Sequence, residues 1–276
     1  MSTRTARCSL IATTVATLCL SVAAQDECLR EAETSVSAGN YWEALKTLDG
    51  CDTSVVRTAM KGLIYYRLYL PDSAQPYLRA AYEAGQRDDE LLISLSEAAL
   101  WKADRQTASS LLAQVGDKNA KAYKFVRASL AEMEHAFDTA LTLYDQIIAT
   151  DPNNHGAYAV FLKAQLLSWM SRFDESIALY AAFVNSPKLP AKIRADAMTK
   201  RAEVMSWMNR FKQALSEADA VLKLSPKHIE ARRVKATVYE WKGNVPRAKQ
   251  MYQEILKLAP DDKEAMNRLA SIDAQK

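Results

Sequence analysis

The sequence predicts an all-α protein built from repeated helical hairpins. Glycine and proline are scarce, at 7 and 8 among 276 residues, which suits helices joined by short loops. The composition is 49% hydrophobic and 25% charged, enough apolar material for an ordinary globular core. The third observation is internal similarity: residues 168–173 (Ser-Trp-Met-Ser-Arg-Phe) recur 38 residues later as residues 206–211 (Ser-Trp-Met-Asn-Arg-Phe). A period of this size indicates an array of helical repeats.

The first 24 residues differ from the rest of the chain. Arg4 and Arg7 form a basic start, residues 8–24 carry no charge, and small residues close the apolar run. This layout is typical of a secretory signal peptide, with cleavage expected after Ala24. An uncleaved N-terminal anchor is the alternative, but the run is shorter than the roughly 20 residues that span a bilayer. No later stretch is long and apolar enough to cross a membrane, and no acceptable glycosylation sequon is present. We therefore expect a bacterial protein that is periplasmic or secreted.

Residues 25–118 are expected to form three degenerate hairpins. The first runs from Ala32 to Cys51, with helices over Glu27 to Ala38 and Tyr41 to Leu48. The second runs from Gly62 to Tyr82 and the third from Ser96 to Val115. All three keep an alanine at the same place in the second helix: Ala44, Ala74 and Ala108.

Residues 119–260 contain four clear repeats, and residues 261–276 are expected to form a capping helix. Each clear repeat has a small residue, an apolar residue nine positions later, a second small residue, an apolar pair and a closing proline. The first small residues follow one another at steps of 36, 38 and 34: Ala128, Ala164, Ala202 and Ala236. Small residues let two helices approach closely. Because no single hairpin can bury its apolar face alone, the hairpins must stack.

This pattern resembles the tetratricopeptide repeat family in its period and in the spacing of its anchors. The resemblance implies a right-handed superhelical solenoid of about seven hairpins plus the capping helix, with a concave groove for protein or peptide partners. Leu167-Ser168-Trp169, followed by Arg172-Phe173 and Ser176, is also similar to periplasmic domains of exopolysaccharide-export and related outer-membrane proteins. The basic clamp by which some family members bind a C-terminal carboxylate is absent, since only Arg233 is basic at the matching positions.

Four of the five tryptophans share one position of the repeat, five residues after the small anchor. They are Trp101, Trp169, Trp207 and Trp241, with Met133 at the same place in the fourth repeat. The resemblance puts this position in the concave groove, together with Tyr158, Phe161 and Arg233. Two interpretations stay open. The indoles form a platform for peptides or for the faces of sugar rings, or they pack against the adjacent helix and stiffen the stack.

Cys28 and Cys51 are the only cysteines that remain after the expected cleavage. They fall at the start of one predicted helix and the end of the next, which lie close together in an antiparallel hairpin. An even number of cysteines in an oxidising compartment favours a disulfide. The alternative is two buried free thiols.

No motif for catalysis, a cofactor or a metal is present. The three histidines (His135, His155 and His228) form no ligand pair and fall in turns or just before a helix, where we expect exposed side chains. Without the signal peptide the chain has 34 basic and 33 acidic residues, which disfavours nucleic acid as a partner. From Ala191 onward, however, the sequence contains 18 basic and 11 acidic residues. The sequence therefore predicts a non-enzymatic scaffold or adaptor in envelope assembly, export or secretion. The alternative is a polysaccharide-binding accessory module.

Overall fold

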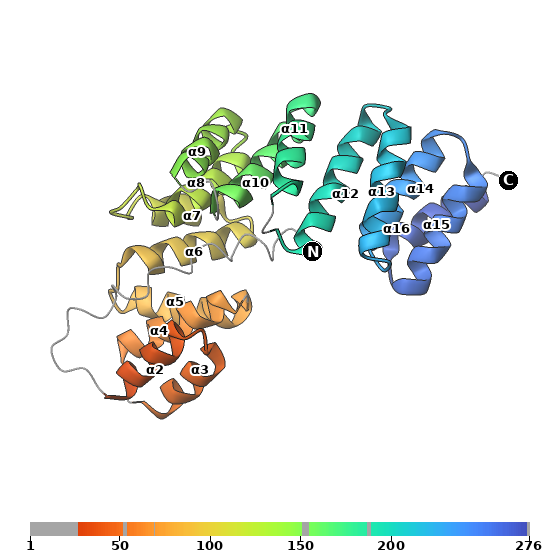
Figure 1. The fold of residues 1–276 in the computed structure, drawn as a ribbon. Coiled ribbons are helices and arrows are strands. Elements are labelled where there is room, and N and C mark those ends of the chain that lie inside the picture. The colour runs from red at the N-terminus through yellow and green to blue at the C-terminus, as the bar shows by residue number, and fades with distance from the viewer. Residues whose placement is uncertain (1–26, 52–53, 69, 151–154, 187–188, 275–276) are drawn as a thin grey trace. The chain divides into compact units, whose positions relative to one another are not determined.

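The computed structural model describes residues 27–51, 54–68, 70–150, 155–186 and 189–274. Within these ranges the protein consists of fifteen α-helices and has no strand (Figure 1). The predicted signal peptide lies outside the described residues. The helices are α2 (Glu27–Ser37), α3 (Tyr41–Gly50), α4 (Val55–Arg67), α5 (Pro71–Glu83), α6 (Asp89–Trp101), α7 (Arg105–Leu112), α8 (Lys121–Met133), α9 (Phe137–Thr150), α10 (His155–Trp169), α11 (Phe173–Val184), α12 (Ala191–Trp207), α13 (Phe211–Leu224), α14 (Ile229–Trp241), α15 (Val245–Leu258) and α16 (Lys263–Ala274).

The chain divides into two compact units, Met1–Ile147 (unit 1) and Ile148–Lys276 (unit 2). The boundary falls near the end of α9. Unit 1 therefore contains α2 to α8 and most of α9, and unit 2 contains α10 to α16.

Successive helices pack as hairpins. In unit 1 the pairs include α2 with α3, α4 with α5 and α6 with α7, and in unit 2 they are α10 with α11, α12 with α13 and α14 with α15. The even-numbered helix opens each hairpin and is called its first helix. First helices also touch one another, α4 and α8 both contacting α6, and α10 and α14 both contacting α12. This arrangement confirms the predicted array of stacked helical hairpins.

The small anchors explain how closely the helices pack. Ala128, Ala164, Ala202 and Ala236 have no exposed surface. At Gly62 of α4, a Cβ atom would lie 2.7 Å from the Leu78 side chain and 2.9 Å from the Leu78 backbone nitrogen. A larger residue at this position would push α5 away from α4, so glycine is required by the close approach.

The second helices supply large aromatic residues to the core. Tyr144, Tyr180 and Tyr252 are at most 1% exposed, and each occupies the same place in its repeat. They lie beside second-helix residues that are wholly buried: Ala140, Ser176 and Ala248. Burying a side chain of this size contributes about 2 kcal/mol or more. The periodic pattern of the sequence therefore marks the true core.

The first hairpin carries the predicted disulfide. Cys28 and Cys51 are bonded, with 5.6 Å between their Cα atoms. Cys28 lies in the first turn of α2, and Cys51 follows the last residue of α3. The helix boundaries differ slightly from those expected, since α2 ends at Ser37 and α3 continues to Gly50.

The last helix closes unit 2. α16 packs against α15 and buries Ala265 and Ile272, while Met266 on its other side is 41% exposed. A largely polar outer face is typical of a capping helix. Among the described helices, none combines the length and apolar character that a membrane span requires.

Candidate binding surface

The first helices of unit 2 share a stripe of residues on one side. Positions separated by three or four, seven and eleven residues lie on the same face of a helix. In α10, α12 and α14 such a stripe ends in tryptophan, and we call the three stripes together the first-helix face. Its members are Tyr158, Phe161, Gln165 and Trp169; Asp196, Lys200, Glu203 and Trp207; and Glu230, Arg233, Thr237 and Trp241.

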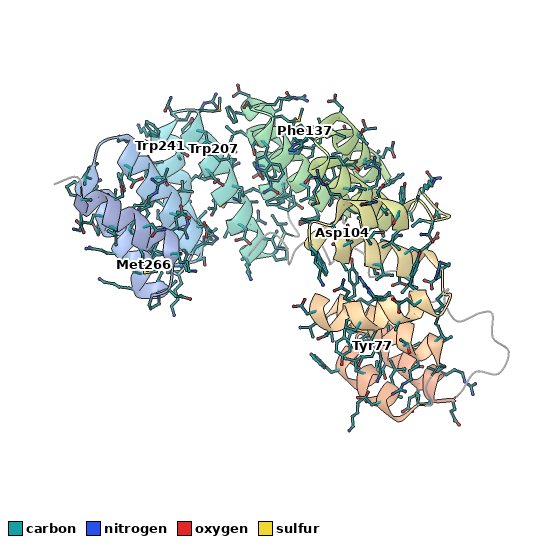
Figure 2. All side chains as sticks on the ribbon, turned by 180° about the vertical axis from the view of Figure 1, so that it is seen from behind. Tyr77, Asp104, Phe137, Trp207, Trp241 and Met266 are labelled. Carbon is teal, nitrogen blue, oxygen red and sulfur yellow. A yellow bond between two sulfur atoms is a disulfide. The ribbon has the colours of Figure 1, made fainter. Side chains whose placement is uncertain are left out.

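The three tryptophans are exposed. Trp169, Trp207 and Trp241 keep 54%, 39% and 50% of their surface accessible, and Figure 2 shows Trp207 and Trp241 at one edge of unit 2. The Trp207 ring lies 6.2 Å from that of Phe173, which begins the second helix of the preceding hairpin. Trp241 and Phe211 repeat this contact at 6.3 Å. One side of the Trp207 and Trp241 indoles thus supports the stacking of hairpins, while much of each ring stays open to solvent.

In unit 1 the same repeat position is more enclosed. Trp101 is partly buried and stacks on Tyr66, with 5.7 Å between the ring centroids. Met133 ends α8 and is also partly buried. The structure therefore gives Trp101 a packing contact within unit 1.

Phe161 differs from its prediction as a ligand-facing residue. It is only 6% exposed, because its ring packs against Tyr180 and Phe183 of α11, with both centroids 5.5 Å away. Tyr158 lies beside it at 6.0 Å in a stacked arrangement and is half-buried. Phe161 therefore belongs to the core of its hairpin.

Arg233 is already occupied by carboxylates. Its guanidinium contacts Glu230 at 3.0 Å, Asp262 at 2.8 Å and Glu264 at 2.9 Å. Burial works against the charge of Arg233, but its hydrogen bonds with Asp262 and Glu230 outweigh this effect and raise its pKa. The same hydrogen bond lowers the pKa of Asp262. Arg233 consequently joins α14 to α16 and is not a free anion-binding group.

Sequence reasoning missed the carboxylates of this face. Asp196 and Glu203 stand seven residues apart on α12, and their side chains are 32% and 34% exposed. Glu203 lies near the buried Tyr180, whose pKa is raised by burial and then by this negative charge. Burial likewise raises the pKa of Tyr252 to about 12, with a further contribution from Glu240. The sequence contains the seven-residue spacing of Asp196 and Glu203, but the excess of basic over acidic residues after residue 191 gave no reason to expect an acidic face there.

His228 also differs from its prediction as an exposed turn residue. It caps α14, because its Nδ1 accepts a hydrogen bond from the Ala231 backbone N–H at 3.2 Å. Its Nε2 lies 3.0 Å from Asp196 of α12, and its side chain is 12% exposed. His135 is in a turn and exposed, as expected. His155 begins α10, one residue earlier than anticipated.

Other kinds of site find little support in the part of the chain that the structure describes. No group of three or more histidine, cysteine or acidic side chains there could hold a metal ion. An open hollow of about 500 Å³ lies on α12 and α13, lined by Met205, Lys212, Gln213, Ser216 and Glu217. Its lining brings together no group of predicted site residues.

Comparison with known proteins agrees with the helical architecture. Residues 208–272 match the family model described as tetratricopeptide repeat. A tetratricopeptide repeat protein from Parabacteroides merdae superposes with a TM-score of 0.64 at 13% identity, over 89% of this chain and 97% of that one. A tetratricopeptide repeat protein fragment from Cytophaga hutchinsonii gives 0.51 at 16% identity, over 87% and 98%.

A third similar structure is the Cut9–Hcn1 hetero-tetramer of the APC/C, with a TM-score of 0.65 at 13% identity. It is matched over 89% of this chain but only 48% of the other, so this chain spans about half its length. None of the curated proteins compared with the chain matches it in sequence. At these identities the structural likeness describes the fold alone.

Proposed function

We propose that the chain is a scaffold that holds a protein or peptide partner on the first-helix face of unit 2, because residues 208–272 match the tetratricopeptide repeat model. The observation that carries this proposal is the set of exposed tryptophans at the ends of α10, α12 and α14. Large apolar side chains grouped on a surface mark interaction sites. Tryptophan is also among the residues that dominate binding energy at protein interfaces.

The compartment proposed for this scaffold is the bacterial cell envelope. Two features support it. Residues 1–24 have the layout of a secretory signal peptide, and the disulfide between Cys28 and Cys51 suits an oxidising environment. A scaffold in that compartment would serve envelope assembly, export or secretion.

Alanine substitution of Trp207 or Trp241 tests the binding surface. Each variant should weaken capture of envelope proteins cross-linked to the purified chain by at least about tenfold, as expected for an interface residue worth about 1.4 kcal/mol or more. The matched control is Trp42→Ala, since Trp42 is 64% exposed on α3 and lies outside this face. If Trp207→Ala leaves capture unchanged but lowers stability by several kcal/mol, the indoles are structural and the proposal fails.

A polysaccharide-binding role is a second candidate, favoured by the exposure of three indoles at the same position of successive repeats. Indole faces stack on the apolar faces of sugar rings. Glycan binding and protein cross-linking distinguish the polysaccharide-binding role from the scaffold role. Binding on a glycan array that is lost in the Trp169→Ala, Trp207→Ala double variant favours the sugar role, and cross-linked protein partners without glycan binding favour the scaffold.

Cell fractionation tests the compartment. Protein expressed from the full sequence should appear in the periplasmic fraction or the medium, cleaved after Ala24. A variant without residues 2–24 should remain in the cytoplasm. Uncleaved full-length protein in the cytoplasmic fraction would contradict the proposed location without affecting the proposed binding surface.

A further inference from the structure

We propose that the partner of the first-helix face is a cationic polypeptide segment carrying several arginine or lysine residues. This inference rests on the proposed scaffold function and specifies the chemistry of its partner. It is carried by the charges on and beside the exposed tryptophans.

Acidic residues are concentrated on this face although the surrounding chain is basic. From residue 191 onward the sequence has 18 basic and 11 acidic residues. Six of the acids lie on the first-helix face or beside it, whereas the bases there are Lys200 and Arg233 on the face and Lys242 beside Trp241. The acids are Asp196, Glu203, Glu230, Glu240, Asp262 and Glu264. Glu240 adjoins Trp241 in α14, and Asp262 and Glu264 reach the face through Arg233.

Both bases on this face are engaged by carboxylates. Lys200 contacts Glu203 at 2.9 Å, and Arg233 contacts three carboxylates between 2.8 and 3.0 Å. The acids outnumber them and keep accessible surface: the side chains of Glu230 and Glu264 are 55% and 56% exposed. The face therefore presents a net negative charge with carboxylate oxygens that can accept further hydrogen bonds.

The tryptophans and carboxylates are placed to act together. Trp207 follows Glu203 by one helical turn, and Trp241 is next to Glu240. A guanidinium or ammonium group binds both to the face of an indole and to a carboxylate. At the neighbouring turns, Arg172 and Arg210 are paired with Glu175 and Asp174. The other basic residues of the region would repel a cationic segment and so direct it to this face.

Three labelled probes test the charge preference on the full chain after removal of its first 24 residues. They are 12-residue peptides of glycine, serine and alanine that carry four arginines, four glutamates or no charge. Fluorescence anisotropy at low salt should show binding of the arginine peptide, with the other two at least about tenfold weaker, a difference of about 1.4 kcal/mol. Raising the salt concentration should weaken binding of the arginine peptide, since salt screens the electrostatic attraction.

A pair of double variants separates this face from general attraction. The double variant Glu203→Gln, Glu230→Gln should bind the arginine peptide about tenfold more weakly than the unsubstituted chain. The matched control is Glu175→Gln with Asp219→Asn, which also removes two negative charges from unit 2. Like the test pair, Glu175 and Asp219 each form an exposed ion pair, with side chains 57% and 53% exposed. The control should change affinity less than twofold, and circular dichroism should show that both variants remain folded.

The outcomes distinguish this inference from the proposed function. Equal weakening by both double variants means general electrostatic attraction and overturns the inference. Preference for the glutamate or uncharged peptide, lost in Trp207→Ala, also overturns it but leaves the scaffold function standing. If no peptide binds and cross-linking in envelope extract captures no protein through Trp207, both proposals fail.

Discussion

Single residues with positive φ shape the turns inside the hairpins. In six hairpins the second residue after the first helix has a φ between 58° and 79°: Gly39, Ala103, His135, Ser171, Asn209 and Gly243. After Ser171, for example, the Arg172 backbone N–H donates to the Leu167 carbonyl at 2.9 Å, which closes the helix end as left-handed C-terminal caps commonly do. Only two of the six are glycine, so the other four hold a conformation that costs a residue with a Cβ atom about 1 kcal/mol.

We therefore expect Ser171→Gly to raise the free energy of unfolding by about 0.5 kcal/mol, because relief of this strain exceeds the added freedom of glycine in the unfolded chain. Gly243→Ala should lower it by about 1 kcal/mol. The control is Ser216→Gly at an exposed position inside α13, where glycine should cost about 0.5 kcal/mol. Urea unfolding measures all three. If Ser171→Gly and Ser216→Gly both lower, or both raise, the free energy of unfolding, the strain assigned to Ser171 is contradicted.

At the residue scale, the sequence predicted what depends on local spacing. The buried alanines and the second-helix tyrosines follow from the repeat period. His228 does not, because its partner Asp196 lies 32 residues earlier and reaches it only when α12 and α14 stack. The burial of Phe161 likewise depends on Tyr180 and Phe183 of the next helix.

Among the elements, the first hairpin is closed by a covalent bond between α2 and α3. Replacing both Cys28 and Cys51 by serine should lower the stability of this hairpin by about 3 kcal/mol, since the unfolded chain loses its cross-link. Hydrogen exchange in α2 and α3 should become faster while α12 to α15 stay unchanged, because an end repeat has a neighbour on one side only. Thiol labelling of the denatured, unreduced protein that lacks its first 24 residues, and with them Cys8 and Cys19, provides the control. Two reactive thiols per chain would show that the bond is absent.

The capping helix α16 is linked to α14 through Asp262 and Arg233, and this link should depend on pH. The folded-state pKa of Asp262 lies below its ordinary value because Arg233 donates to it. The stabilisation is therefore complete above the ordinary value near 3.8 and is lost as the pH falls through the lower, folded value. Asp262 also caps α16, accepting from the Ala265 N–H at 2.8 Å, a role that asparagine can keep.

Asp262→Asn should thus lower the free energy of unfolding by about 1 kcal/mol at pH 7. The difference from the unsubstituted protein should shrink only as the pH falls through the folded-state pKa of Asp262, which lies below its ordinary value, because the protonated carboxyl and the amide are both neutral. Urea unfolding at several pH values measures this. Asp261→Asn removes a neighbouring exposed charge without affecting the Arg233 pair and serves as control. A difference that persists unchanged at a pH where Asp262 is protonated in the folded protein would contradict the electrostatic explanation.

At the scale of the whole molecule, repeat period and charge placement differ in how well they can be predicted. The order of the hairpins follows from anchors that recur at nearly constant steps, so a single sequence suffices to predict it. The acidic character of the first-helix face comes from residues of α12 and α14 together with Asp262 and Glu264, which contact Arg233, and it becomes apparent only when such ion pairs bring these residues together. Counting charges along the chain averages this face with the basic residues around it.

The two units each have their own buried clusters, with Ile64 in unit 1 and Ile255 in unit 2 at most 1% exposed. In a repeat array each hairpin contacts only its neighbours, so destabilisation should stay local. Ile255→Ala should cost about 3 kcal/mol and speed hydrogen exchange in α13 to α16, leaving α4 to α7 unchanged. Ile64→Ala, a matched substitution in α4, should give the reverse pattern. Hydrogen-exchange mass spectrometry measures both, and equal acceleration throughout the chain by either variant would mean that all the repeats unfold together.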